Sequence, residues 1–252
     1  MKTRLPILLS IPHGGTKIPR NARNSFLLNR KHRIADGDAY TMKLYQFKDF
    51  EVVRFPYARA FLDLNRHHDD LPPNNPDGVF KTHTIFNASV WKKFPDTANQ
   101  VTWLDTYYTP YFETLTNVIQ SKRLGIDCHS MLDKDPFDHE KPLRPMLCIS
   151  NGGANSQTNA QDLTAPMPLM HTFKTILERH FGENTVLIND PFQGGHIIRY
   201  MHAKTQKPWI QLEVNRSLYM FSDFPARLNV KRFKSLKEKL YRSLIELMKG
   251  IE

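Results

Sequence analysis

Cysteine is scarce in this sequence, and long apolar runs are missing. Two cysteines, Cys128 and Cys148, occur in 252 residues; they are too few for a disulfide framework, and both lie in apolar stretches where reduced, partly buried thiols are expected. No apolar run approaches the roughly 18–20 residues of a membrane-spanning helix, so no membrane partner is expected. The N-terminal run PILLSIP is short and lacks an Ala-x-Ala-like cleavage site, which predicts a first buried strand rather than a signal peptide. The cytoplasm is the expected location.

Negative charge is also in deficit. The chain has 35 Lys and Arg against 25 Asp and Glu, a net charge of +10. The basic residues are dispersed, and their densest run, at residues 229–242, carries apolar residues at helical spacing. This pattern predicts an amphipathic helix with a solvated basic face, not a nucleic-acid arm. A basic domain of this kind suits an enzyme for anionic substrates, and nucleic acid is not an expected partner.

Short apolar runs alternate with helical patterns along the chain. Strands are predicted at residues 5–11, 51–57, 123–129, 146–151, 185–190 and 209–214. Helices are predicted at residues 38–47, 97–121, 167–180 and 226–248. Residues 67–80 and 131–145 are expected to be long loops. Strands separated by helices indicate an α/β fold, with a mixed, mainly parallel central sheet between helices on both faces, and we expect one domain over residues 1–252.

Ligands of such sheets bind beyond the carboxyl ends of the strands, and polar side chains stand there in this sequence. His13 follows the first predicted strand, His129 ends the third and Glu213 ends the last. Imidazoles and a carboxylate suit zinc, and a catalytic zinc site needs three protein ligands. The third ligand would be Asp36 or Asp38, in the segment RIADGDAY. Either aspartate could instead cap a helix N-terminus.

Asp127 lies two residues before His129. On a strand the two side chains share one face, so Asp127 could accept an imidazole N–H and fix the orientation of the ring. Capping a loop or a helix is the alternative. Cys128, between them, would face the core.

Six segments together resemble the N-formylglutamate amidohydrolase family. They are IPHGGTKIP, ADGDAYTMKLY, YARAFLDLNR, IDCHSM, GGHIIRYMH and IQLEVNRSLYM, in the family's order, and they cover residues 13–220. A more distant likeness joins them to aspartoacylase and the zinc carboxypeptidases. The resemblance implies a three-layer phosphorylase/hydrolase-like sandwich and zinc-dependent hydrolysis of a small anionic N-acyl amino acid. The natural candidate is N-formyl-L-glutamate, cleaved to formate and glutamate.

The resemblance also implies the metal ligands. His13 and His129 would bind one zinc ion. Asp38 is favoured over Asp36 as the carboxylate ligand.

The resemblance implies further roles around the metal. Glu213 would act as general base and then protonate the departing amine. Asn65 and Arg66 would hold the substrate carboxylate, Arg59 would polarise the carbonyl, and Arg199 is a candidate second carboxylate clamp.

Several neighbouring residues receive supporting interpretations. Asp63 is expected to orient an arginine, and Arg216 to lie at the surface or behind the site. Gly194 and Gly195 would shape the loop before Arg199. The cluster at residues 67–70 is interpreted as part of a lid rather than a second metal site.

One alternative belongs to another class. The hydrolase scaffold could serve as a basic binding protein for nucleic acid or an acidic partner. Its binding would weaken with salt.

Overall fold

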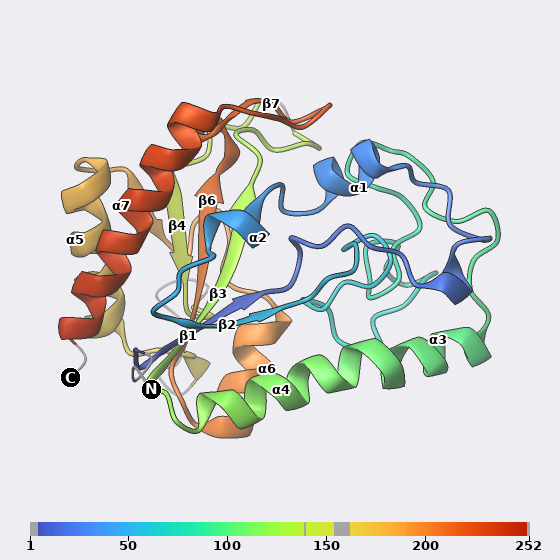
Figure 1. Ribbon diagram of the computed structural model, residues 1–252, viewed down its shortest axis with the longest axis horizontal. Coiled ribbons are helices and arrows are strands. Elements are labelled where there is room, and N and C mark those ends of the chain that lie inside the picture. The colour runs from blue at the N-terminus through green and yellow to red at the C-terminus, as the bar shows by residue number, and fades with distance from the viewer. Residues whose placement is uncertain (1–4, 139, 154–161, 251–252) are drawn as a thin grey trace.

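The centre of the molecule is a six-stranded sheet with the strand order β2-β1-β3-β6-β4-β5 (Figure 1). The computed structural model describes residues 5–138, 140–153 and 162–250. The strands are β1 (Ile7–Ile11), β2 (Glu51–Arg54), β3 (Leu124–Met131), β4 (Leu147–Ser150), β5 (Val186–Ile188) and β6 (Trp209–Asn215). β4 runs antiparallel to β6, and the other neighbouring strands are parallel. The expected mixed, mainly parallel sheet is confirmed.

The central strands are buried along their whole length. Every residue of β1, β3 and β6 is buried, as in parallel strands that are covered on both faces. The short N-terminal apolar run is therefore a buried strand, as predicted. Cys128 on β3 and Cys148 on β4 are free, buried thiols, and Cys128 belongs to the hydrophobic core.

Helices cover both faces of the sheet. The main ones are α4 (Thr109–Ile119), α5 (Met167–Phe181), α6 (His196–Thr205) and α7 (Val230–Lys249). α5 and α7 share one core cluster with Leu9 of β1, while α4 and α6 share the other with its neighbour Leu8. Figure 1 shows α5 and α7 together on one side of the sheet. The three-layer sandwich is confirmed.

Two predicted helices are close to the observed ones. The helix expected at 97–121 is α3 (Thr97–Trp103), a π-helical turn (Leu104–Tyr108) and α4. The helix expected at 226–248 begins later, because β8 (Arg227–Leu228) pairs with β7 (Met220–Ser222). Asn229 then caps α7 by accepting a hydrogen bond from the N–H of Arg232. No helix in the described part of the chain is both long and apolar enough to cross a membrane.

Two other expectations differ from the structure. The single helix predicted at 38–47 is wrong: α1 (Arg30–Asp36), capped by Asn29, ends before Gly37, and α2 (Thr41–Leu44) follows. α6 was not predicted, because Gly194 and Gly195 precede it and its N-cap has no side chain to signal the start. The break between α1 and α2 matters for function, because Asp38 lies in it.

Candidate active site

Three neighbouring parallel strands, β1, β3 and β6, end at the same edge of the sheet. His129 on β3 stands in register with Glu213 on β6, and Asp127 stands in register with Gln211. Side chains at paired positions point to the same face of a sheet. His13 lies two residues beyond the end of β1. The strand ends thereby bring His13, His129 and Glu213 to one cleft.

His13, Asp38 and His129 form a buried group of possible metal ligands. Nδ1 of His129 lies 2.9 Å from Oδ2 of Asp38, and Nδ1 of His13 lies 3.6 Å from the same oxygen. The backbone N–H of Asp38 donates to the carbonyl of His13 at 2.9 Å. This bond ties the segment between α1 and α2 to the end of β1 and so places the carboxylate between the two rings.

The other candidate carboxylate, Asp36, has different partners. Its Oδ1 accepts the backbone N–H of Ile85 at 2.9 Å and pairs with the buried Nζ of Lys81 at 3.3 Å. Asp38, not Asp36, therefore lies beside the two imidazoles. Lys81 was not predicted; a lysine gives no local sign that its distal amine is buried.

Each imidazole uses its second nitrogen to bind another carboxylate. Nε2 of His13 lies 2.8 Å from Oδ1 of Asp63, and Nε2 of His129 lies 2.7 Å from Oδ2 of Asp127. Asp63 also binds Nε of Arg59 at 2.8 Å. The expectation that Asp63 orients an arginine is met, but its contact with His13 was not foreseen.

A hydrogen-bonded chain continues behind Asp127. Ser10 on β1 donates to Oδ1 of Asp127 at 2.6 Å, and the Ser10 hydroxyl is 2.9 Å from the hydroxyl of Tyr111 on α4. All three side chains are buried. The orientation of His129 is thus linked to α4, the helix that packs on the same face of the sheet.

The donor set fits a zinc ion. Both imidazoles direct Nδ1 toward Asp38, while their Nε2 atoms are held by carboxylates. Metal-binding histidines characteristically donate their second ring N–H to such a group. Two imidazole nitrogens and one carboxylate oxygen form a ligand set of catalytic zinc sites. His13, Asp38 and His129 could therefore hold the metal.

Burial and charge oppose each other within this group. Burial disfavours the charged form of Asp38, but hydrogen bonds from His129 and His13 outweigh it and hold the pKa of Asp38 well below its usual range. Burial likewise acts to lower the pKa of His129, yet Asp127 and Asp38 raise it well above its ordinary value. Asp38 is therefore an ionised carboxylate, the form that binds a cation.

Glu213 is a buried carboxyl group that lines the cleft. Burial raises its pKa to about 7, although the charge of His129 opposes the shift. Nε2 of Gln211 donates to Oε1 of Glu213 at 3.0 Å, and Oε1 of Gln211 accepts the backbone N–H of Gly195 at 2.8 Å. The second bond fixes which way the Gln211 amide faces. Gln211 was not predicted, although its i−2 spacing from Glu213 was a usable signal.

Arg59 and Arg66 line the cleft. Asp63, bound to Arg59, is fully buried, which raises its pKa, but Arg59 and His13 hold the pKa of Asp63 well below its usual range. Arg66 binds the backbone and side chain of Asp77. Both guanidinium groups are therefore positioned by carboxylates and still partly exposed to the cleft.

Asn65 is engaged differently from the expectation. Its Oδ1 accepts the N–H of Ile197 at the start of α6, and its Nδ2 lies 3.4 Å from Oε1 of Gln211. The side chain lines the cleft, but both ends of its amide contact the protein. Asn65 thus helps to position Gln211.

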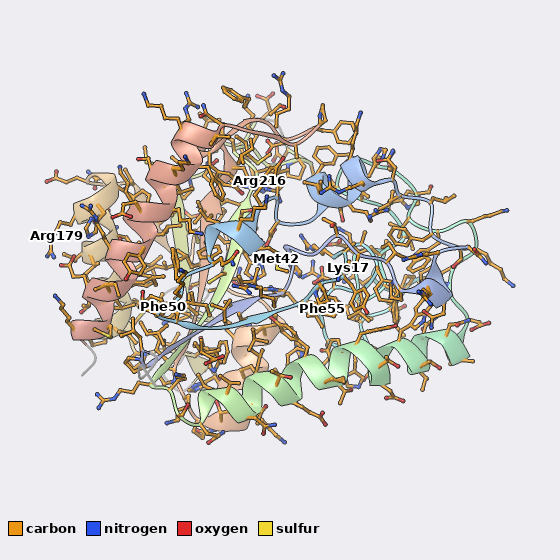
Figure 2. All side chains as sticks on the ribbon, in the orientation of Figure 1. Lys17, Met42, Phe50, Phe55, Arg179 and Arg216 are labelled. Carbon is orange, nitrogen blue, oxygen red and sulfur yellow. The ribbon has the colours of Figure 1, made fainter. Side chains whose placement is uncertain are left out.

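Of two further predicted arginines, Arg199 lies away from the cleft and Arg216 lines it. Arg199 is exposed on α6, donates to the carbonyl of Gly152 at 3.1 Å and is not among the residues lining the cleft. The structure therefore does not bring it to the other candidates. Arg216 was expected at the surface or behind the site, and the structure shows the second: it is buried, and its Nη2 lies 3.5 Å from Oδ1 of Asp38. Its guanidinium also donates to the carbonyls of Ala35 and Gly37. Figure 2 shows Arg216 among the central elements, whereas Arg179 lies at the outer edge of the molecule.

The cleft has a volume of about 410 Å³. Loops contribute further lining residues that were not predicted, among them Arg144, Phe137 and Phe192. The donor atoms of His67, His68 and Asp69 also lie within 4.8 Å of one another, but these side chains are exposed. They are not among the lining residues of this cleft.

An open mixed sheet whose carboxyl edge gathers imidazoles, carboxylates and arginines defines an α/β protein with a hydrolase-type candidate metal centre. Comparison with known sequences makes this class more specific. A family model for N-formylglutamate amidohydrolase matches residues 5–220. The chain belongs to the N-formylglutamate amidohydrolase family.

Individual relatives agree with this assignment. An N-formylglutamate deformylase of Pseudomonas aeruginosa is 26% identical over 239 residues, which are 88% of this chain and 85% of the relative. One of Pseudomonas putida is 28% identical, covering 86% of this chain and 82% of the relative. A crystal structure of N-formylglutamate amidohydrolase from Ralstonia eutropha shares the fold, with a TM-score of 0.81 and 18% identity over 98% of this chain and 94% of that chain. The alternative of a basic binding protein gains no support from these relatives.

Proposed function

We propose that the protein is a zinc-dependent amidohydrolase that cleaves N-formyl-L-glutamate to formate and glutamate. The observation that carries the proposal is the buried group of His13, Asp38 and His129 beside Glu213, in a chain of this family. The relatives from Pseudomonas aeruginosa and Pseudomonas putida, which are named as N-formylglutamate deformylases, support the choice of substrate. The net charge of +10 suits an anionic substrate.

His13, Asp38 and His129 would hold the metal, and zinc would supply Lewis acidity for the formyl carbonyl and the attacking water. Glu213 accepts a proton from that water, because its ionised form is a base in a buried site. The water oxygen bonds to the formyl carbon, and the C–N bond breaks. Glu213 then returns the proton to the departing nitrogen, which leaves formate and the free amine of glutamate.

Two arginines of the cleft stabilise negative charge on the substrate. Arg59, held by Asp63, stabilises the negative charge that develops on the carbonyl oxygen. Arg66 binds the carboxylate next to the scissile amide. Asn65 acts with Gln211, whose amide N–H keeps Glu213 oriented toward the substrate.

The test combines metal content with product release. We expect about one zinc per chain by elemental analysis and stoichiometric formate release from N-formyl-L-glutamate. Glu213→Gln should retain the zinc and lose turnover by about 10²–10⁴-fold, since it removes the base and none of the ligands. A protein that takes up no metal and releases no formate when zinc is added would contradict the proposal.

A further inference from the structure

Four arginines line the cleft among the described residues: Arg59, Arg66, Arg144 and Arg216. They differ in how far their donors are already used. Arg216 is 2% exposed and makes hydrogen bonds to two backbone carbonyls and to Ser130. Arg59 and Arg66 each bind a carboxylate oxygen at 2.7–2.8 Å.

Arg144 has the least committed guanidinium of the four. Its carboxylate partner among the described residues is Oδ2 of Asp135, 3.6 Å from Nη2, which is too long for a strong hydrogen bond. That carboxylate is bound instead by Nζ of Lys141 at 3.0 Å and by the backbone N–H of Phe137. Within the described part of the chain the guanidinium makes one hydrogen bond, from Nη1 to the carbonyl of Leu132, and it is 3.4 Å long. Most of its five N–H donors therefore remain available to a ligand.

Arg144 is nevertheless firmly positioned. Its backbone N–H donates to the carbonyl of Asp133 at 2.9 Å, and its own carbonyl accepts from Nδ2 of Asn215 at 3.2 Å. Asn215 ends β6, two residues after Glu213. The guanidinium carbon lies 5.0 Å from the ring centroid of Phe192, which also lines the cleft. A cation held over an aromatic ring and anchored at its backbone is ready to bind an anion with little loss of entropy.

Arg144 also differs from Arg59 in the residues it contacts. Arg59 is joined through Asp63 to His13, so it belongs beside the scissile amide. Arg144 comes from the loop between β3 and β4 and is neither hydrogen-bonded nor ion-paired to His13, Asp38 or His129. Arg144 thus lines the same cleft from a different loop than the candidate ligands.

We propose that Arg144 binds the side-chain carboxylate of the substrate and so makes the enzyme selective for N-acyl derivatives of dicarboxylic amino acids. This inference rests on the proposed function, and it names a specificity residue of that same cleft. Arg66 binds the carboxylate next to the amide, and Arg144 binds the distal carboxylate. An arginine suits the task because its planar fork matches a carboxylate with two parallel hydrogen bonds.

The experiment compares two nearly isosteric ligands, N-formyl-L-glutamate and N-formyl-L-glutamine, which differ in the charge of the distal group. Binding is measured by calorimetry on zinc-loaded Glu213→Gln protein, where turnover does not interfere. We expect the glutamate ligand to bind about 10–100-fold more tightly than the glutamine ligand. Adding Arg144→Gln should remove this preference while leaving the affinity for the glutamine ligand within about threefold.

A matched control is available in the same loop. Lys134 is exposed and does not line the cleft, so Lys134→Gln removes the same charge and should leave the preference intact. Steady-state kinetics on protein that retains Glu213 should agree. There, Arg144→Gln should raise KM for the glutamate substrate and leave KM for the glutamine substrate unchanged. Unchanged preference in Arg144→Gln, equal loss for both ligands, or no binding of either ligand would overturn the assignment. Preferential binding without formate release from the wild type would instead remove the proposed function and leave the role of Arg144 standing.

Discussion

The candidate metal centre contains two histidine–carboxylate pairs that are alike in geometry and unlike in origin. In the His129 pair, Asp127 and His129 lie two residues apart on β3 and their bond is 2.7 Å long. In the His13 pair, the bond to Asp63 is 2.8 Å long but spans 50 residues and joins the end of β1 to a loop. The same support for an imidazole is thus built once within a strand and once by the tertiary fold.

Asp63 and Asp127 also differ in their other hydrogen-bond partners. Asp63 binds Arg59 and the backbone N–H of Asn65 in addition to His13. Among the described residues, the side chain of Asp127 binds the Ser10 hydroxyl in addition to His129. We therefore expect the His13 pair to influence substrate groups directly, and the His129 pair to act through the metal ligand alone.

The largest effect is expected from removing either imidazole. His13→Ala and His129→Ala each delete one of the three proposed ligands, so zinc content should fall well below one per chain and kcat/KM at least about 10³-fold. Elemental analysis and formate release measure both. Zinc content equal to that of the wild type in either variant would show that its ring is not a ligand.

A smaller effect, and a difference between the pairs, is expected from the carboxylates. Asp63→Asn and Asp127→Asn should each weaken zinc binding about 10–100-fold, as measured by competition with a chelating dye. At saturating zinc, Asp63→Asn should still have low kcat/KM because Arg59 has lost its partner, whereas Asp127→Asn should recover to within a few fold. Equal kcat/KM values for Asp63→Asn and Asp127→Asn at saturating zinc would contradict this difference between the two pairs.

The pH dependence should come from Glu213, which stands in register with His129. Burial raises the pKa of Glu213 to about 7, and the base acts in its ionised form. Activity should therefore fall as the pH drops through this pKa, by about tenfold per pH unit below it. A bound cation lowers the pKa, so the decline is expected at or below pH 7. A kcat/KM that rises as the pH is lowered from 7.5 to 5.5 would contradict a carboxylate base.

The smallest effect is expected from Tyr111→Phe, which shortens the chain behind the His129 pair. Ser10 keeps its bond to Asp127, so zinc affinity should fall only about 2–5-fold and stability by about 1 kcal/mol. Thermal unfolding and zinc competition measure these changes. Tyr241→Phe, which removes a hydroxyl bonded to the remote Asp49, is the control and should leave zinc affinity unchanged.

Much of the fold could be predicted because its signals are local. Continuous apolar runs indicated the buried strands, and helical spacing indicated α5 and α7. α1 was missed because it is short and polar, so that packing rather than periodicity decides its structure. α6 was missed because the glycine at its N-cap gives no capping signal.

The candidate site was predicted where strand ends alone determine the position. His129 with Asp127 followed from i and i+2 spacing on one strand. The bond between His13 and Asp63 could not be foreseen, because sequence spacing says nothing about which loop returns to a strand end. Arg199 and Arg144 show the same limit, since only the loop path decides which arginine reaches the cleft.

The hydrogen bonds from Tyr111 through Ser10 to Asp127 bear on protein engineering. A designer who grafted only the two imidazoles and three carboxylates onto another scaffold would copy the visible centre and omit what aims it. The ring of His129 would then be hydrogen-bonded to an aspartate whose rotamer is no longer fixed. A faithful transplant would need a serine on the neighbouring strand and a tyrosine on the helix beneath, so the smallest portable unit of this centre spans two layers of the sandwich.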